Sequence, residues 1–360
     1  MSDRTIISSD TGNGGVNAVL AKTNGRTKQF YTPSVRAMAT GDTLGLGSME
    51  MEYQYVDWHG ARYVVGDDVT RVTKRGISRH MGADRYGNEF HQFLTAFAIA
   101  NLGIKSGQVD LTVFAPPGLY NQSKDNIIAG FTSNPVEIRL KGDKKARKWK
   151  YSTVRVLPEG VAGVLCYTLD KHGKPFQADL LNGNILVMDG GAQTFDAVLL
   201  RNGNLNPESL DSATWEAGGI NDLIRKPILR KIKAEGRDFE TLTVDDIDRV
   251  IRVGLVTGDY ILTHAGYEID LKPHVDHHRG LYARWVADNI IDGEYNGLDG
   301  IKGAVLVGGW VDLVHDHLLE WYGEKIIDHK KHKTTKRLAP VDMNAFGGLR
   351  YRLYKLNEGK

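Results

Sequence analysis

The segments that decide the fold are DTGNGGVNAVL (residues 10–20) and DGGAQTFDAVL (residues 189–199), which align without a gap. The first and third residues and the last three coincide, which makes five identities in 11 positions. Each segment follows a short apolar stretch and resumes an apolar run after a glycine-bearing turn, so both predict strand, turn, strand. The copies lie 179 residues apart, much further than the roughly 20–50 residues of a solenoid period. The repeat therefore predicts two similar domains facing one another, with two unrelated hairpins as the alternative.

The composition is that of an ordinary globular protein: 360 residues, 41% hydrophobic and 25% charged, with a net charge of +2. Disorder, collagen and coiled coil are excluded, and no global basic field indicates nucleic-acid binding. The sequence has no run of about 18 apolar residues, which argues against a membrane span. Lone Cys166 cannot form an internal disulfide, and the first ten residues lack the pattern of a signal peptide. We therefore expect a cytoplasmic protein with no membrane partner.

The rest of the chain alternates between predicted strands and helices. Apolar spacing predicts helices over residues 89–103 and 277–291, and buried strands over 109–118 and 303–309. Thr243, with Asp246 three residues on, resembles a capping box that opens another helix. This alternation predicts an α/β fold with mainly parallel or mixed sheets covered by helices.

Residues 33–88 are weakly periodic and rich in Gly, Tyr and Asp, so we expect a small insertion rather than core. Their aromatic residues predict either exposed strands available for subunit contact or a small self-packed sheet. These aromatic residues are Tyr53, Tyr55, Trp58 and Tyr63.

Each copy of the repeat offers a candidate phosphate cradle. In a turn of the form Asp-x-Gly, glycine lets backbone N–H groups approach a phosphate, and the carboxylate can hold hydrated Mg²⁺. Either turn alone is an everyday hairpin, but two could grip one triphosphate from opposite sides. The first cradle consists of Asp10, Thr11, Gly12, Asn13, Gly14 and Gly15. The second consists of Asp189, Gly190, Gly191, Gln193 and Thr194.

Between the copies, the segment YSTVRVLPEGVAGVLCYTL (residues 151–169) predicts a strand, then Pro158-Glu159-Gly160, then a helix of small residues. Glu159 is expected at the carboxyl end of this strand, where ligands gather in open α/β sheets. A carboxylate there could orient a water for attack on a γ-phosphate. Its alternative role is that of a first-turn helix carboxylate favoured by the helix dipole.

Two glycine pairs are candidate nucleoside contacts. Gly308-Gly309 closes the last apolar strand before a helix, and Gly218-Gly219 precedes another apolar stretch, where it could face the base or ribose. Neither pair belongs to G-x-G-x-x-G, and the P-loop pattern is also absent from the sequence. This excludes two common classes of nucleotide-binding protein.

In order along the chain, these motifs resemble the phosphate-1, connect-1, phosphate-2 and adenosine motifs of the actin superfamily. The matching residues are Asp10-Thr11-Gly12-Asn13-Gly14, Pro158-Glu159, Asp189-Gly190-Gly191 with Thr194 and Asp196, and Val307-Gly308-Gly309. Within the superfamily, the chain is most similar to the ParM (StbA) plasmid-segregation actins and their archaeal actin-like relatives. The resemblance implies an actin-like (ribonuclease H-like) duplicated fold with two domains around a nucleotide cleft. It places domain I at residues 1–185 plus 340–360, and domain II at residues 186–339.

The resemblance also assigns roles to single residues. Glu159 becomes the hydrolytic glutamate, Asp10 and Asp189 the carboxylates on the Mg²⁺ side, and Gly308 and Gly309 the adenosine contacts. Where many relatives have a third glycine, this chain has Trp310. That residue either stacks near the base or caps the helix. The nucleotide bound with Mg²⁺ could therefore be ATP or GTP, and the choice between them stays open.

The function implied by the resemblance is that of a polymerising ATPase. Its filaments would segregate a plasmid or other DNA through an adaptor protein that binds DNA, and hydrolysis would destabilise them. The competing hypotheses are a monomeric actin-fold small-molecule kinase, a chaperone-like regulatory ATPase, and a nucleotide-gated scaffold with negligible turnover. Electron microscopy with and without ATP is the most informative single observation, and phosphate release separates the polymerising ATPase from the scaffold.

Two further features stay outside this assignment. Histidines crowd at residues 274–278 and 315–321. Although such spacings can bind metal, no HExxH or Cys/His framework accompanies them, and a solvated helix face is the expectation. Basic runs at residues 141–150 and 325–337 are expected to be solvated loops or contacts for DNA or an acidic partner.

Overall fold

The computed structural model describes residues 4–22, 26–39, 53–72, 76–80, 82–204 and 212–358. The chain divides into two compact units. Unit 1 comprises Met1–Pro158, Lys171–Gly173 and Gly348–Lys360, and unit 2 comprises Glu159–Asp170 and Lys174–Gly347. The chain passes from unit 1 to unit 2 after Pro158 and returns to unit 1 after Gly347. The domain boundaries expected from the sequence, after residues 185 and 339, stay a prediction.

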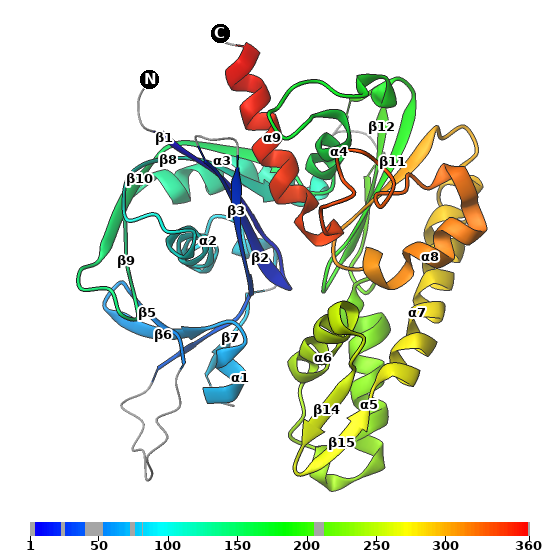
Figure 1. Ribbon diagram of the computed structural model, residues 1–360, viewed down its shortest axis with the longest axis horizontal. Helices are drawn as coiled ribbons and strands as arrows, with labels where there is room; N and C mark the ends of the chain where they lie inside the picture. Colours follow the sequence, from blue (N-terminus) through cyan, green and yellow to red (C-terminus); the bar gives the residue numbers. More distant parts are fainter. Residues whose placement is uncertain are drawn as a thin grey trace. The chain divides into compact units, whose positions relative to one another are not determined.

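Unit 1 contains a ten-stranded sheet in the order β3-β2-β1-β8-β10-β9-β5-β6-β4-β7, which curves around α2 (Figure 1). Its strands are β1 (Arg4–Thr11), β2 (Gly15–Ala21), β3 (Thr27–Pro33), β4 (Arg36–Met38), β5 (Tyr55–Trp58), β6 (Ala61–Val65), β7 (Ile77–Ser78), β8 (Ser106–Ala115), β9 (Val136–Leu140) and β10 (Arg147–Pro158). Its helices are α1 (Asp68–Val72), α2 (Glu89–Asn101), α3 (Tyr120–Thr132) and the part of α9 (Met343–Glu358) that follows Gly347. Strands β1, β8 and β10 are parallel neighbours, so their carboxyl ends meet at one edge of the sheet.

The predicted helix at 89–103 is confirmed as α2. Residues next to its two ends explain where it begins and where it stops. The Asn88 side chain accepts the backbone N–H of His91 at 3.0 Å and so caps the first turn. Gly103, at φ +99°, follows the helix end as a C-terminal stop. The buried strand predicted at 109–118 is β8, which ends just before Pro116-Pro117.

The expectation that residues 33–88 form a small insertion rather than core holds only in part among the described residues. Val35, Ala37, Val64 and Val69 form a small hydrophobic cluster of their own, whereas other residues of the segment join the main sheet and its core. Strand β5 pairs with β9 and thereby extends the main sheet. Trp58 is 3% exposed and packs edge-to-face on Phe93 of α2. Of the aromatic residues of this segment, Trp58 is buried and the three tyrosines are partly exposed. Residues 40–52, 73–75 and 81 of the predicted insertion lie outside the described residues.

Unit 2 contains a four-stranded sheet in the order β13-β12-β11-β16 and a separate hairpin, β14-β15. The strands are β11 (Asn184–Gly190), β12 (Phe195–Arg201), β13 (Ser212–Trp215), β14 (Ile261–His264), β15 (Tyr267–Asp270) and β16 (Gly303–Val307). The helices are α4 (Val161–Thr168), α5 (Lys226–Glu235), α6 (Val244–Thr257), α7 (Lys272–Val286), α8 (Val311–Tyr322) and the start of α9. Together they enclose a hydrophobic core that includes Phe195, Tyr282 and Trp310.

The sequence signals in unit 2 are mostly confirmed. Thr243 and Asp246 form a capping box at the start of α6. The helix predicted at 277–291 begins earlier, at Lys272, and its last residues form a π-helical turn over Ala287–Ile291. Among the described residues, no helix combines the length and apolar character needed to cross a membrane.

Candidate nucleotide site

The two predicted turns have the same backbone geometry. In unit 1, β1 and β2 pair with Asp10 opposite Asn17, and Gly12 N donates to Gly15 O at 3.0 Å. In unit 2, β11 and β12 pair with Asp189 opposite Asp196, and Gly191 N donates to Thr194 O at 2.9 Å. All of these positions differ by the same 179 residues, so the predicted strand-turn-strand repeat is confirmed down to its register. The first strand of each hairpin also has a parallel neighbour, β8 or β16.

The first turn is held from behind by Arg85, whose side chain is fully buried. Its Nη2 donates to Thr11 O at 2.8 Å and to Gly12 O at 3.0 Å, and its Nη1 donates to Asn13 Oδ1. No carboxylate pairs with this guanidinium among the residues that the structure describes. Ser34 adds two bonds, from Oγ to Gly12 O at 2.6 Å and from its backbone N to Gly14 O at 3.2 Å.

These contacts decide where the amides of the turn point. In a planar trans peptide, the carbonyl of one residue and the N–H of the next point in opposite directions. Since Arg85 and Ser34 hold the carbonyls of Gly12 and Gly14, the N–H groups of Asn13 and Gly15 are directed away from them. An array of outward N–H groups is what binds an anion such as phosphate.

In the second turn, backbone N–H groups rather than side chains bind the carbonyl groups and so orient the amides. Gly191 O accepts the N–H of Ile220 at 3.1 Å, and Ala192 O accepts the N–H of Asn221 at 2.9 Å. These donors stand at the start of the helical segment that continues into α5. By the same peptide geometry, the N–H groups of Ala192 and Gln193 are directed away from that segment.

The strand-end carboxylate of unit 2 is fixed by a residue from far along the chain. Asn344, at the start of α9, donates from Nδ2 to Asp189 Oδ2 at 2.9 Å. Its Oδ1 accepts the backbone N–H of Gly160, also at 2.9 Å. One amide side chain therefore joins the Asp189 strand end to the residue that follows Glu159.

Glu159 lies between Pro158, where β10 ends, and Gly160, which precedes α4. Gly160 has φ +69°, and a Cβ there would lie 3.2 Å from Asp189 Cβ. The turn that carries Glu159 thus packs directly on Asp189. Glu159 is partly exposed, which suits a group that must reach water.

Gly308 and Gly309 close β16 beside the same carboxylate. Gly308 has φ +94°, and a Cβ there would lie 2.5 Å from Gly190 O and 2.6 Å from Asp189 Oδ1. A side chain at this position would therefore displace the strand end that carries Asp189. Both glycines are partly exposed, and their contact with a nucleoside stays a prediction.

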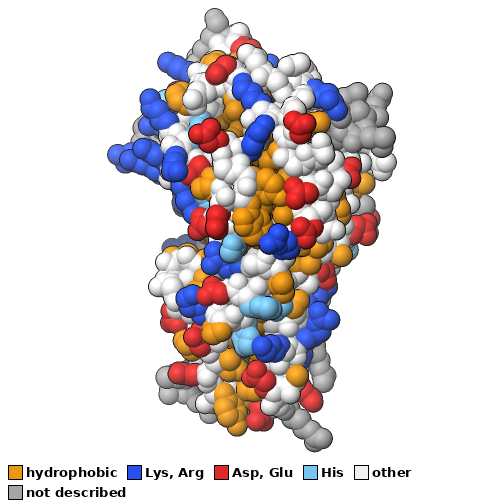
Figure 2. Space-filling view, turned by 90° about the vertical axis from the view of Figure 1, so that its right-hand side faces the viewer, with side chains coloured by type: hydrophobic (Ala, Val, Ile, Leu, Met, Phe, Trp, Pro, Cys, Tyr) orange, Lys and Arg blue, Asp and Glu red, His pale blue; other side chains and the backbone are white. Residues whose placement is uncertain are grey.

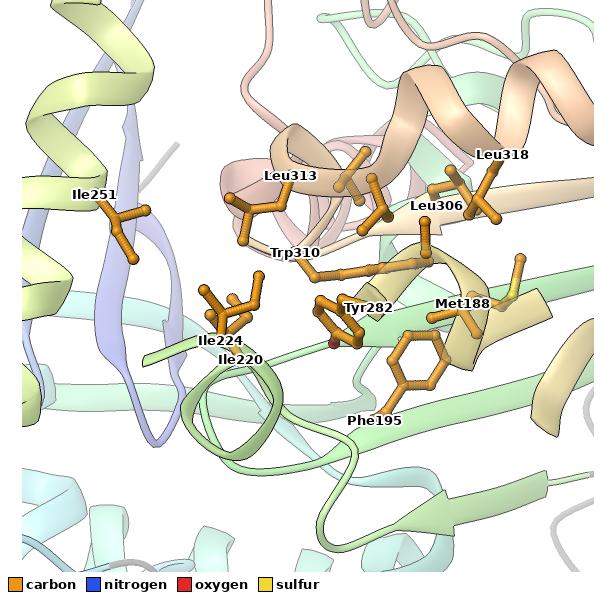
Figure 3. Packing of buried hydrophobic residues seen from close by; sticks show 14 of the residues in the cluster. Met188, Phe195, Ile220, Ile224, Ile251, Tyr282, Leu306, Trp310, Leu313 and Leu318 are labelled. Atoms are coloured by element: carbon orange, nitrogen blue, oxygen red, sulfur yellow. The ribbon is translucent and has the colours of Figure 1, made fainter. Parts of the chain in front are cut away.

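The side chain of Trp310 has the geometry of neither role left open for it, stacking near the base or capping the helix. Its ring is fully buried, lies among Phe195, Tyr282 and Leu306, and donates its Nε1–H to Val307 O at 2.6 Å (Figure 3). The ring centroid lies 4.6 Å from that of Phe195. Trp310 therefore joins α8 to the core as a packing residue.

Gly218 and Gly219 are also packing residues rather than exposed nucleoside contacts. Both are buried. A Cβ on Gly219 would lie 2.3 Å from the backbone of Gln193, and one on Gly218 would lie 2.7 Å from the Trp285 ring. The pair lets the start of the helical segment approach the second turn closely.

Two carboxylates face each other across the hairpin of unit 2. Burial raises the pKa of Asp189, although the hydrogen bond from Asn344 opposes the shift. Burial also raises the pKa of Asp196 to about 7, and the nearby Asp189 charge adds to the shift. Thr214 and Thr194 donate hydrogen bonds to the two oxygens of Asp196.

Unit 2 thus brings together five of the predicted residues: Glu159, Asp189, Gly190, Gly308 and Gly309. The residues of the first cradle, from Asp10 to Gly15, form a turn in unit 1, and their action on the same nucleotide stays a prediction. Sequence reasoning missed Arg85, Asn344 and the Ala192 amide. No local pattern marks Arg85 or Asn344, because each acts on a turn many residues away.

Comparison with known proteins agrees with this geometry. Residues 8–161 match the family model described as Actin like proteins N terminal domain. No curated protein matches the chain significantly. Among solved structures, the archaeal actin homolog Ta0583 in complex with ADP is similar with a TM-score of 0.72 at 17% identity, over 99% of this chain and 100% of that one. A ParM described as the pCBH non-polymerisable quadruple mutant gives 0.70 at 16% identity, over 99% and 100%. The apo psk41 ParM gives 0.66 at 17% identity, over 99% of both chains.

The chain therefore has the actin fold, and each unit contains one copy of the strand-turn-strand hairpin. Its residues 8–161 match a family of actin-like proteins, and the solved structures that it resembles in fold include ParM proteins and an archaeal actin homolog. The resemblance stated from its motifs is confirmed at this level.

Proposed function

We propose that this protein is a polymerising, nucleotide-hydrolysing actin-like protein whose cytoplasmic filaments segregate a plasmid or other DNA. The observation that carries the proposal is the pair of hairpins with one register, one turn hydrogen bond and an aspartate at each strand end. A fold with only one such turn would provide half of the predicted phosphate grip.

The ligand proposed for both turns is one nucleoside triphosphate. The amides that Arg85 and the Ile220–Asn221 backbone turn outward supply donors for its phosphates. The complex of Ta0583 with ADP supports a purine nucleotide. Since Trp310 is buried, its presence in place of a glycine does not distinguish ATP from GTP.

Magnesium fits the residues on this side of the site. Asp189 presents a carboxylate whose Oδ2 is fixed by Asn344 and whose Oδ1 faces Gly308, and oxygen donors are what Mg²⁺ prefers. Asp10 supplies a second carboxylate at the corresponding strand end of unit 1. When bound, the ion would neutralise charge on the phosphates.

Glu159 is the proposed catalytic residue. Its carboxylate would accept a hydrogen bond from the attacking water and orient it in line with the γ-phosphate. The Gly160–Asn344–Asp189 connection would keep that carboxylate in register with the phosphate turn.

Polymerisation follows if nucleotide contacts favour one arrangement of the two units. Such a ligand shifts the population towards the arrangement that it binds better. A head-to-tail contact between identical chains does not close on itself and so propagates as a fibre. The pCBH ParM neighbour, described as a non-polymerisable mutant, supports self-assembly as the behaviour to test.

The decisive experiment combines light scattering, high-speed sedimentation and electron microscopy with Mg-ATP, Mg-GTP or no nucleotide. Scattering should rise after a lag above a critical concentration and decay as nucleotide is consumed. Polymers of Glu159→Ala should persist, because their hydrolysis is slowed. A protein that stays monomeric with both nucleotides and phosphorylates a small molecule instead would contradict the filament function and favour the kinase. A DNA pull-down with and without cell extract then tests for the adaptor.

A further inference from the structure

A buried cluster in unit 2 lies outside the proposed nucleotide site. It consists of His315 on α8 and the adjacent pair Asp328 and His329 in the segment that follows α8. One ligand atom from each residue lies within 4.8 Å of the other two. His315 is 2% exposed and His329 is 5% exposed, so the ring nitrogens have little access to water.

Two ring nitrogens of this cluster have no partner. His315 Nε2 and His329 Nδ1 are buried and make no hydrogen bond among the described residues. His315 Nε2 lies 3.3 Å from Asp328 Oδ1, but the two groups lack the alignment of a hydrogen bond. Leaving a buried nitrogen without a hydrogen bond costs free energy, so two such nitrogens in one cluster require an explanation.

The surroundings prepare His315 to be a ligand. Its other nitrogen, Nδ1, lies 2.9 Å from the Asp316 carboxylate, which Lys330 Nζ also contacts at 3.0 Å. The carboxylate accepts a hydrogen bond from Nδ1–H, and the tautomer with its proton on Nδ1 has a lone pair on Nε2. The same arrangement, a carboxylate behind a metal-binding histidine, recurs in zinc sites.

Asp328 is also positioned from outside the cluster. Its Oδ1 accepts the backbone N–H of Lys330 at 2.9 Å. In a tetrahedral zinc site with ligand distances of about 2.0–2.1 Å, neighbouring ligand atoms are about 3.3–3.4 Å apart. The 3.3 Å separation of His315 Nε2 and Asp328 Oδ1 has this length.

We propose that His315, Asp328 and His329 bind a zinc ion, with water as the fourth ligand. Two imidazoles and one carboxylate suit zinc, whereas magnesium prefers oxygen ligands alone. The site would join α8 to the segment that leads to Pro340, whose carbonyl accepts the N–H of Gly308 at 3.1 Å. Bound zinc would therefore stabilise the segment of unit 2 that leads to Pro340 and its hydrogen bond with Gly308.

The histidines at residues 274–278 provide a matched contrast. They lie on α7, where His277 is exposed and His274 and His278 are partly exposed. Histidine side chains also lie on the surface between charged groups in the space-filling view (Figure 2). The α7 histidines include a pair with the i, i+4 spacing of metal ligands, but they lack the buried nitrogens without hydrogen bonds that the cluster around His315 contains.

The test is zinc binding to the full chain, freed of metal with a chelator and titrated with zinc chloride by calorimetry. We expect about one zinc ion per chain, a rise in the thermal unfolding temperature, and the intense visible absorption of tetrahedral cobalt when Co²⁺ replaces Zn²⁺. His315→Gln and His329→Gln should each weaken binding at least 100-fold and abolish the cobalt absorption. The control variant, His274→Gln with His278→Gln, should leave all three readouts unchanged.

A second variant keeps the proposal testable if the buried substitutions unfold the protein. Asp316 is largely exposed, and Asp316→Asn should fold normally yet weaken zinc binding about 10-fold to 100-fold, the usual effect of losing a carboxylate behind a metal-binding histidine. Absence of stoichiometric binding by the wild type would overturn the proposal. Binding that is lost in the α7 control but retained in Asp316→Asn and His329→Gln would also overturn it and place the metal on the helix surface.

Discussion

The two hairpins of the repeat have the same backbone geometry, but different groups hold their turns in place. In unit 1, a buried guanidinium from Arg85 binds the turn carbonyls, whereas in unit 2 the N–H groups of Ile220 and Asn221 do so. At the strand ends, Asp10 faces Asn17, while Asp189 faces Asp196. The register of a hairpin is thus set by its turn and by the hydrogen bonds between its strands. The carbonyl groups of the turn can be bound by different hydrogen-bond donors, a side chain in one unit and backbone N–H groups in the other.

The difference also separates two proposed tasks. The hairpin of unit 2 is connected through Asn344 to the turn that carries Glu159, so it lies beside the proposed hydrolytic group. The hairpin of unit 1 is connected to Arg85 and Ser34, which only orient its amides. Variants in unit 1 should therefore change nucleotide affinity, and variants at Glu159 should change the rate of hydrolysis.

The largest effect is expected for Glu159→Ala. Phosphate release should slow by roughly 10²-fold or more, the scale of a positioned proton-transfer group, while nucleotide affinity changes little. The measurement is steady-state phosphate release alongside fluorescence titration with a labelled nucleotide. Asp10→Ala and Asp189→Ala are the companion variants, and each should weaken Mg-nucleotide binding or turnover. Hydrolysis at the normal rate in Glu159→Ala would contradict the proposal that the two units have different roles in nucleotide binding and hydrolysis.

The next effect is expected for Arg85→Met, which tests the support of the first turn. The change removes the buried donor of the Thr11 and Gly12 carbonyls without leaving a charge behind. We expect the free energy of unfolding to fall by about 2–3 kcal/mol, the cost of unpaired buried carbonyls. The nucleotide Kd should rise about 10-fold, because the turn amides lose their fixed direction.

The control for Arg85 is Arg62→Met in the same unit. Arg62 pairs with Asp57 on the surface, and surface ion pairs contribute about 0–1 kcal/mol. Urea unfolding and nucleotide titration should place this variant close to the wild type. Equal effects of the two substitutions would mean that Arg85 contributes no more than an exposed arginine.

Local chemistry explains which parts of this architecture were predictable. The turns follow from Asp-x-Gly between apolar runs, and α2 and α6 follow from caps within a few residues of their starts. Arg85 and Asn344 could not be predicted, because their function depends on long-range packing onto residues 11–13 and on Asp189. Trp310 was misjudged for the same reason: its sequence position beside Gly308-Gly309 does not reveal that its ring turns into the core.

A smaller effect is expected for Gly308→Ala, which tests how tightly β16 closes on the hairpin of unit 2. The new Cβ would meet Gly190 O and Asp189 Oδ1, and φ +94° is unfavourable for alanine. We expect a loss of about 2 kcal/mol in the free energy of unfolding, together with weaker nucleotide binding. Gly309→Ala is the matched control, since its Cβ would find no atom closer than 3.7 Å and should change stability by less than about 0.5 kcal/mol. Equal stability of the two variants in urea would show that the strand end adapts freely.

The smallest effect is expected for Asp196→Asn, which gives the hairpin of unit 2 the pairing that unit 1 already has. Asp189 would then face an amide, as Asp10 faces Asn17. Burial and the neighbouring Asp189 raise the pKa of Asp196 to about 7, whereas an aspartate in an unfolded chain has a pKa of about 3.9. Between these two values the folded protein holds a proton that the unfolded chain has released.

The sign of the effect follows from that proton. When the folded state binds more protons, the free energy of unfolding falls as the pH rises, here from about pH 4 to about pH 7. Asparagine does not titrate, so Asp196→Asn should be no more stable than the wild type at pH 4 and about 1 kcal/mol more stable at pH 8. The full shift would be worth more, but the Asn side chain has one acceptor oxygen for the two threonine hydroxyls that Asp196 binds. Urea unfolding across this pH range measures the difference. A constant difference between the two proteins from pH 4 to pH 8 would show that the facing carboxylates of unit 2 are no more strained than the Asp–Asn pair of unit 1.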